Sequence, residues 1–300
     1  MTSLLVVGES LVDVTATPDG TTSWPGGSPL NIAVGCARLG VPTVLATQIG
    51  DDATGDLVRD HLDRSDIDVR SLPPHRPETS TARAAIDEAG HATYEFDLTW
   101  DPSELPAPTD FGCIHVGSIG ATLAPGADAV AALAVEASET GVPVTFDPNV
   151  RPSITPDMSD VRRRVTALAD VATVIKLSDE DADVLFPDVA DVLAMLVGSS
   201  RTRLAVMTCG GRSVLLQSDS ARVEVAPPVV DVVDTIGAGD SFMSALIWAL
   251  TERGRFGGAT LDAAELAELG AIAARAAAIT CTRAGADPPT RDDLGYSALS

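Results

Sequence analysis

The chain has 300 residues, of which 45% are hydrophobic, and its formal net charge is −23 at pH 7. A chain of this length can bury one large core without disulfide bonds. The strong negative charge argues against unaided binding to nucleic acids or anionic membranes, since both repel an acidic protein. We therefore expect small molecules as partners.

The cysteines and the N-terminus indicate a cytoplasmic protein. Cys36, Cys113, Cys209 and Cys281 are far apart and form no CxxC pair, so neither a disulfide framework nor a zinc site is indicated. The N-terminus lacks the basic region of a signal peptide. No apolar run approaches the roughly 20 residues of a membrane span.

Short apolar segments alternate with helical ones along the chain. The predicted strands are 4–7, 44–47, 113–116, 142–146, 171–177, 204–208, 213–217 and 222–225. The predicted helices are 30–39, 127–139, 156–169, 238–253 and 261–282. Continuous apolar runs are typical of strands buried on both faces, so the alternation predicts an α/β fold with a doubly wound, mostly parallel sheet flanked by helices.

Two stretches break this alternation. Residues 12–17 and 79–98 are rich in β-forming residues and have no helix between their strands, which predicts a small second sheet. A surface hairpin without a role is the alternative. We call the segments 12–24 and 79–100 the lid, and expect it to belong to a single domain that spans residues 1–300.

The sequence DTIGAGDSF at 234–242 places a carboxylate at the start of a helix, directly after a glycine turn. The first N–H groups of a helix have no intrahelical partner, and with the helix dipole they form an anion site. Asp240 would repel a phosphate there, so we expect it to take the proton of a hydroxyl group that attacks a phosphoryl group. A capped helix after a tight turn is the structural alternative.

This stretch resembles the DTxGAGDxF signature of the ribokinase-like, or PfkB, sugar kinases, in which the second aspartate is catalytic. The family's first signature has its counterpart in GGSPLNIA followed by RLG, within residues 26–40. The resemblance is closest to the fructokinases. It implies a ribokinase-like fold, a lid that keeps water from the reaction, and Gly237, Ala238 and Gly239 as N–H donors to the charge that develops in transfer.

Sugar recognition requires convergent polar groups, because each hydroxyl that loses water needs a new partner. Asp13 follows the first strand, at the carboxyl end of the sheet where such proteins bind ligands. The resemblance assigns Asp13, Gly26, Gly27 and Asn31 to the sugar site. A turn-forming role for Asp13 and a helix-capping role for Asn31 are the alternatives.

Aromatic residues of the lid are candidates for covering the sugar. Tyr94 and Phe96 are two residues apart on a predicted strand, so both side chains point to one face. Packing within the lid is the competing interpretation. Arg83, on the preceding lid strand, contacts either the ligand or water.

Phosphoryl transfer requires positive charge near the phosphates. Arg151 lies in DPNVRP at 147–152, which resembles the DPNxRP of fructokinase-like members and follows a buried strand. Lys176 is the only lysine of the chain and ends the predicted strand 171–177. We expect it to bring a compact, mobile charge to the nucleotide, and a chance survivor of a strong arginine bias is the alternative.

The nucleotide is assigned to two further segments by the resemblance. Thr208, Gly210 and Gly211 correspond to the family's TxGxxG loop. Ala274 and Ala277, on the late helix, offer apolar contact to the adenine.

The metal assignments also come from the resemblance. Ser178 and Asp181 stand where the family has NxxE, which arranges magnesium and phosphates. Aspartate in place of glutamate favours a water-mediated role for Asp181, with Mg²⁺ held mainly by the ATP phosphates. Asp234, with the turn at 282–286, resembles the family's potassium site, and K⁺ is left open.

These observations predict an ATP-dependent kinase that phosphorylates a primary hydroxyl of a free sugar, with fructose as the leading substrate. A 2-keto-3-deoxygluconate kinase is less favoured because the run at 94–97 is acidic. A nucleoside kinase is less favoured because the lid shows no evident aromatic stack. A non-catalytic sugar or nucleotide sensor is the remaining alternative, and a homodimer formed through the lid is left open.

Overall fold

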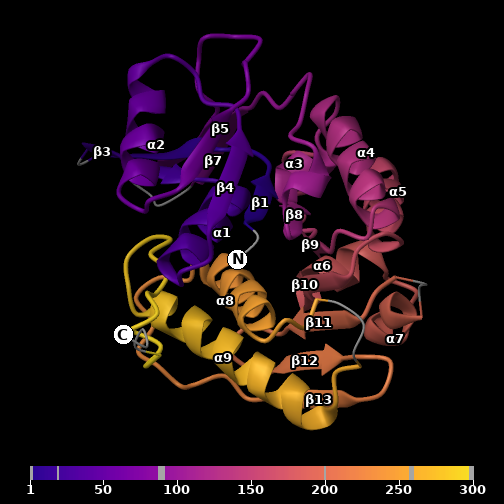
Figure 1. Ribbon diagram of the computed structural model, residues 1–300. Coiled ribbons are helices and arrows are strands. Elements are labelled where there is room, and N and C mark those ends of the chain that lie inside the picture. Colours follow the sequence, from indigo (N-terminus) through magenta and orange to yellow (C-terminus); the bar gives the residue numbers. More distant parts are fainter. Residues whose placement is uncertain (1–2, 19, 87–91, 199–200, 257–259, 297–300) are drawn as a thin grey trace.

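The computed structural model describes residues 3–18, 20–86, 92–198, 201–256 and 260–296. Within these residues the strands form two sheets, one of nine strands and one of four. Helices cover both faces of the larger sheet (Figure 1). The predicted doubly wound, mostly parallel α/β fold is therefore confirmed. Residues 87–91 of the predicted lid lie outside the described residues.

The main sheet has the strand order β13-β12-β11-β10-β9-β8-β1-β4-β5. Its strands are β1 (Leu4–Val7), β4 (Thr43–Thr47), β5 (Asp68–Ser71), β8 (Cys113–Gly117), β9 (Val144–Asp147), β10 (Val174–Ser178), β11 (Leu204–Thr208), β12 (Val214–Gln217) and β13 (Arg222–Val225). In the series β11-β10-β9-β8-β1-β4-β5 all neighbouring strands pair in parallel, and β12 and β13 add two antiparallel strands next to β11. The carboxyl ends of the parallel strands lie on the same side of the sheet, and the site lies there.

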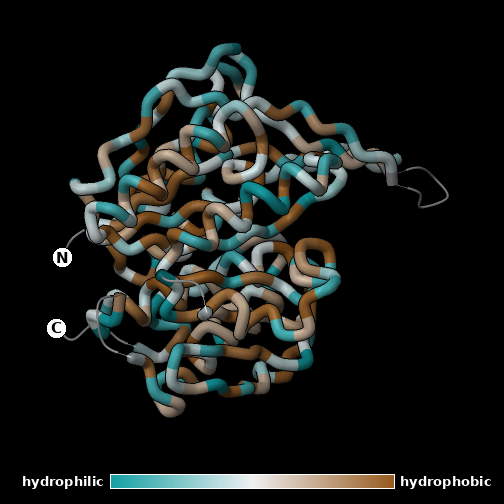
Figure 2. The backbone as a smooth tube through the Cα atoms, turned by 90° about the vertical axis from the view of Figure 1, so that its right-hand side faces the viewer, coloured by the Kyte–Doolittle hydropathy of each residue, from teal (hydrophilic) through white to brown (hydrophobic). Residues whose placement is uncertain are grey.

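Two hydrophobic layers sandwich this sheet in the described part of the chain. One face carries α1 (Ser28–Arg38), α2 (Ala53–Asp63), α8 (Ala238–Glu252) and α9 (Ala263–Cys281). The other carries α3 (Ser118–Thr122), α4 (Gly126–Glu139), α5 (Met158–Ala169), α6 (Asp179–Leu185) and α7 (Val192–Val197). Figure 2 shows hydrophobic stretches running through the interior of this body.

Helix α8 is the central helix of its layer. Every residue from Asp240 to Leu250 is buried, and α8 packs against both α1 and α9. A helix that is apolar all round is stable only inside a protein. Its first turn is consequently held in one position, and Asp240 with it.

The second sheet has the order β3-β2-β6-β7, with β2 (Leu11–Thr17), β3 (Gly20–Gly26), β6 (Thr81–Ile86) and β7 (Ala92–Asp97). Asp13 lies inside β2, which differs from its predicted place at the end of a main-sheet strand. The register puts Trp24, Asp13, Ala82 and Phe96 in one row across the sheet. Residues of one row share a face, so Asp13 and Phe96 point to the same side.

Several short elements were not predicted. Helix α2 is one, although Asp52 caps it by accepting from the Gly55 N–H, and Val58 and Leu62 are buried four residues apart. Strand β5, the 3-10 helix at Pro108–Asp110 and helices α3, α6 and α7 were not predicted either. Strand β10 extends to Ser178, so Lys176 lies within the strand and not at its end. No helix in the described ranges is long and apolar enough to cross a membrane.

Candidate active site

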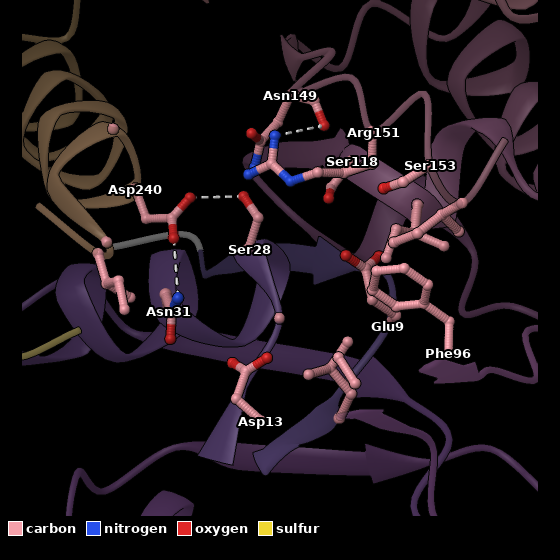
Figure 3. Close-up of a pocket in the computed structure, with 18 of the residues that line it drawn as sticks. Glu9, Asp13, Ser28, Asn31, Phe96, Ser118, Asn149, Arg151, Ser153 and Asp240 are labelled. Atoms are coloured by element: carbon pink, nitrogen blue, oxygen red, sulfur yellow. Dashed lines mark hydrogen bonds between the residues drawn. The ribbon is translucent and has the colours of Figure 1, made fainter. Parts of the chain in front are cut away.

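A cavity of about 830 Å³ lies between the second sheet and the carboxyl ends of the main-sheet strands. Most of the residues predicted to bind sugar or phosphate line it. These are Asp13, Gly27, Asn31, Tyr94, Phe96, Arg151, Lys176, Gly237, Gly239 and Asp240. The fold therefore gathers residues from both ends of the chain around one space (Figure 3).

Asp240 lies in the first turn of α8 with 8% of its surface exposed. Its Oδ1 accepts a hydrogen bond of 2.6 Å from the Ser28 hydroxyl, and its Oδ2 accepts one of 2.8 Å from the Asn31 amide. Both donors belong to the first turn of α1 (Figure 3). Asn31, which was predicted to contact the sugar, thus fixes the orientation of the Asp240 carboxylate.

The turn before α8 requires glycine at position 237 and is closely packed at position 239. Gly237 has a φ of 74°, in the left-handed region, and a Cβ there would lie 2.6 Å from the Cβ of Ala286. A Cβ at Gly239 would lie 3.0 Å from the Lys176 Nζ. The backbone can therefore approach a ligand closely here, and the lysine lies directly beside the turn. Ala238 does not appear among the residues that line the cavity.

Arg151 reaches the cavity from the loop after β9. Its Nη1 donates to the Val150 carbonyl at 3.1 Å, and its side chain is exposed. Asn149, two residues earlier, has a φ of 39°, and Ser118, after β8, has a φ of 52°. Both of these residues also line the cavity. Positive φ is costly outside glycine and concentrates at functional sites.

Lys176 and Asp147 form a buried ion pair on adjacent strands, with Nζ and Oδ2 2.8 Å apart. Lys176 is 4% exposed and Asp147 is 1% exposed. Burial raises the pKa of Asp147 to about 6, against the opposing effect of the lysine charge. Burial lowers the pKa of Lys176, but the attraction of Asp147 outweighs it and the pKa is raised. The predicted mobile lysine is in fact held in place by this ion pair.

Asp13 faces the cavity from β2, with its carboxylate beside Gly26. Burial raises its pKa, and the charge of Arg151 opposes this shift. A Cβ at Gly26 would lie 2.2 Å from the Asp13 Oδ2. Gly27 has a φ of 108°, and a Cβ there would lie 2.7 Å from the Glu9 carbonyl oxygen. The two glycines thus leave room for the carboxylate and for the chain at Glu9.

The aromatic residues of β7 cover the cavity from the second sheet. The rings of Tyr94 and Phe96 are nearly parallel, with 7° between their planes and centroids 6.4 Å apart. Arg83 lines the same cavity from β6. The sequence argument against a nucleoside substrate, that the lid has no aromatic stack, is therefore wrong.

Ser178 and Asp181 form the capping box of α6. The Asp181 Oδ2 accepts from the Ser178 N–H at 3.0 Å and from the Ser178 hydroxyl at 2.8 Å. Its Oδ1 accepts from the Val150 N–H at 2.8 Å. Asp181 thus stabilises the loop that carries Arg151. Neither Ser178 nor Asp181 is among the residues that line the cavity. Their roles at metal and nucleotide stay predictions.

The other residues assigned to the nucleotide lie at the end of β11, in the loop after it and on α9, which packs against β12 and β13. Thr208 ends β11, and Gly210 follows with a φ of 56°. A Cβ at Gly210 or Gly211 would meet no described atom within 4 Å. Ala274 is buried in the core, whereas Ala277 is half-buried on α9. These assignments also stay predictions.

Asp234 ties the loop before α8 to the turn after α9. Its Oδ1 accepts from the Ile236 N–H at 3.0 Å, and its Oδ2 accepts from the Gly285 N–H at 2.9 Å. Hydrogen bonds from the backbone lower its pKa. The two segments that resemble the potassium site are therefore neighbours. Within the described residues, no group of three or more His, Cys, Asp and Glu is placed to hold a metal ion.

Sequence reasoning missed Glu9, Ser28 and Ser118, which all line the cavity. Glu9 is 4% exposed, and burial raises its pKa to about 7. The available signal was a carboxylate two residues after the buried strand Leu4–Val7, at the carboxyl ends of the strands where such sheets bind ligands.

Glu9 makes the stability of the protein depend on pH. Its pKa rises from 4.5 to about 7 on folding, so the folded state prefers the protonated form. The stabilisation from this group is complete below pH 4.5 and is lost as the pH rises through 7. We expect the free energy of unfolding of the wild type, relative to Glu9→Gln, to fall by about 3 kcal/mol over this interval. Urea unfolding of both proteins at several pH values measures it, and parallel pH profiles would contradict it.

Comparison with known proteins gives one consistent result. The profile of the pfkB family carbohydrate kinase matches residues 1–293. The chain is 31% identical to a fructokinase of Klebsiella pneumoniae, covering 97% of this chain and 98% of that protein. It is 30% identical to probable fructokinase-4 of Arabidopsis thaliana, over 97% of this chain and 95% of that protein. The crystal structure of fructokinase with bound ATP from Xylella fastidiosa superposes with a TM-score of 0.82 at 25% identity, over 98% of this chain and 97% of that one.

Proposed function

The chain belongs to the pfkB family of carbohydrate kinases, and from this premise we propose that it transfers the terminal phosphoryl group of ATP to the primary 6-hydroxyl of fructose. The product is fructose 6-phosphate. The family membership supports the reaction, and the fructokinases among the similar proteins support the sugar. We also propose a single kinase domain with a lid, located in the cytoplasm, where the free cysteines stay reduced.

One observation carries the mechanism: the Asp240 carboxylate faces the cavity at the glycine turn while Ser28 and Asn31 hold both of its oxygens. In our proposal Asp240 orients the sugar hydroxyl and accepts its proton. Phosphoryl transfer has a loose transition state, so the proton can leave late and a weak base suffices. The N–H groups of Gly237 and Gly239, which line the cavity, donate to the developing charge, whereas the Ala238 N–H donates to the Thr235 carbonyl at 3.2 Å.

Two cations of this chain serve the phosphates in the proposal. Arg151 is exposed at the cavity wall, where its guanidinium can reach an anionic ligand. Lys176 is buried beside Gly239 and lines the cavity, so its charge acts on the same turn. The glycine turn and these cations suit the triphosphate of ATP. When bound, Mg²⁺ neutralises phosphate charge, and we assign it mainly to the phosphates themselves, with Asp181 acting at most through water.

The adenine base is assigned to the space between the Thr208–Gly211 loop and α9. Val229, Val232 and Val233 are exposed, by 101%, 62% and 65%, in the loop that precedes α8. The Val233 N–H donates to the Cys281 carbonyl, so the backbone at Val233 lies beside the end of α9. For K⁺ we propose the junction of Asp234 with residues 282–286.

A panel of substrates tests the choice of sugar. Fructose, 2-keto-3-deoxygluconate, ribose and adenosine are offered with ATP, and ADP release is measured. We expect the highest kcat/KM with fructose. A higher value with the acid sugar or the nucleoside would overturn the fructose assignment, and ATP binding without release of ADP on any substrate would indicate a sensor.

We further propose a homodimer formed through the lid. Trp24 and Tyr94 are 61% and 66% exposed, and the register places Trp24 on the same face of the sheet as Phe96. A second copy of the chain that covers the exposed parts of Trp24 and Tyr94 would bury these rings. We expect sedimentation to give a dimer for the wild type, and Trp24→Ser to shift the equilibrium towards monomer by at least about tenfold in Kd. A wild-type monomer at micromolar concentration would contradict the proposal.

A further inference from the structure

Glu9 is a buried carboxyl group that the proposed mechanism does not use. It follows β1 at the carboxyl edge of the main sheet and lines the cavity. Its Oε2 accepts a hydrogen bond of 2.7 Å from the Gly120 N–H. Its Oε1 is buried and has no hydrogen-bond partner among the described residues.

The surroundings fix this carboxyl group in one position. A Cβ at Gly120 would lie 3.1 Å from the Glu9 Oε2, and a Cβ at Gly27 would lie 2.7 Å from the Glu9 carbonyl oxygen. Glycines from two other segments, Gly27 and Gly120, therefore pack against Glu9. With one oxygen anchored and the backbone confined, the position of Oε1 is set as well.

Support of Gly120 explains only one of the two oxygens. A buried polar atom without a partner costs free energy, and native proteins contain few of them. If Glu9 served only to hold the α3 backbone, the second oxygen would be an unexplained cost. A ligand that brings a hydroxyl group to Oε1 removes this cost.

The position of Glu9 fits such a ligand. Figure 3 shows its carboxyl group turned towards the cavity that Asp13, Arg151 and Asp240 enter from other elements. Ser118 also lines the cavity and lies close enough to Glu9 to lower the pKa of its carboxyl group. Burial keeps that pKa near 7, so the group can either donate or accept in the neutral range.

We propose that Glu9 is a substrate-positioning residue whose Oε1 forms a hydrogen bond with a hydroxyl group of the bound sugar other than the one that is phosphorylated. This inference rests on the proposed function, because it requires a polyhydroxylated substrate in the cavity. Asp13 and Asp240 contact other parts of the same sugar, so three carboxyl groups on separate elements fix its orientation.

Deoxy analogues of the sugar test this contact. The wild type, Glu9→Leu and Glu9→Gln are assayed with fructose and with analogues that each lack one hydroxyl group. We expect the wild type to lose about tenfold to hundredfold in kcat/KM on one analogue. Glu9→Leu should show a similar loss on fructose itself and no further loss on that analogue, while the KM for ATP is unchanged.

Glu9→Gln keeps the bond to Gly120 and guards against misfolding of the leucine variant. It should remain folded and discriminate that analogue less than the wild type does. Asp101→Asn is the matched control, since Asp101 is a half-buried acid that accepts from the Gln48 amide outside the cavity. It should retain the wild-type preference among analogues.

The outcomes separate the two proposals. Sugar phosphorylation with equal losses on every analogue in the wild type and both Glu9 variants would overturn the role of Glu9 and leave the kinase assignment intact. Absence of sugar-dependent ADP release from the wild type would overturn the proposed function, and the Glu9 contact with it.

Discussion

Replacing Asp240 by asparagine should lower kcat for sugar phosphorylation by about 10²–10⁴, with ATP binding nearly intact. Asparagine has a similar shape and can still contact Ser28, but its amide cannot accept the proton of the attacking hydroxyl. The hydrogen bonds from Ser28 and Asn31 hold the carboxylate in one orientation at the cavity. Steady-state kinetics with calorimetric titration of ATP measures both quantities.

Asp231→Asn is a suitable control, since Asp231 is exposed in the loop that precedes α8 and lies outside the cavity wall. It removes the same charge from the same region and should leave kcat within a factor of about two. Wild-type turnover by Asp240→Asn would refute the assignment of Asp240 as the base.

Replacing Lys176 by methionine should lower the free energy of unfolding by about 3–5 kcal/mol. The substitution leaves Asp147 buried without its counter-charge, and Asp147 Oδ1 already has no partner among the described residues. Urea unfolding measures the loss. Activity should fall as well, because the positive charge beside Gly239 is removed.

The double variant Lys176→Met with Asp147→Leu should recover most of this stability, since neither charge then remains buried. Arg222→Met is the matched control. It breaks the exposed pair of Arg222 and Asp191, at 2.6 Å, and should cost less than about 1 kcal/mol. A cost of similar size for Lys176→Met would show that the buried pair contributes little.

The sequence predicts the order of the main elements and the position of Asp240, because both depend on local patterns. The apolar runs of β1 and β8 and the glycine turn before α8 are readable over a few residues. Helix α2 was readable too, since Asp52 caps it and Val58 and Leu62 recur four residues apart. The helix was not predicted because the capping role of Asp52 was overlooked.

Contacts between distant segments could not be read in this way. The bond between Ser28 and Asp240 joins residues 212 positions apart, and the pairing of Lys176 with Asp147 depends on strand order. Ser178 and Asp181 fit two interpretations, and the structure tests only one of them. Their spacing matches a capping box as well as a metal motif, and the structure places them in the cap of α6.

The most direct test is to follow the reaction of the wild type with ATP and ¹³C-labelled fructose by ³¹P and ¹³C NMR. We expect equal amounts of ADP and fructose 6-phosphate, and almost none of either with Asp240→Asn. Release of inorganic phosphate without sugar phosphate, or formation of fructose 6-phosphate by the variant at the wild-type rate, would contradict the central claim.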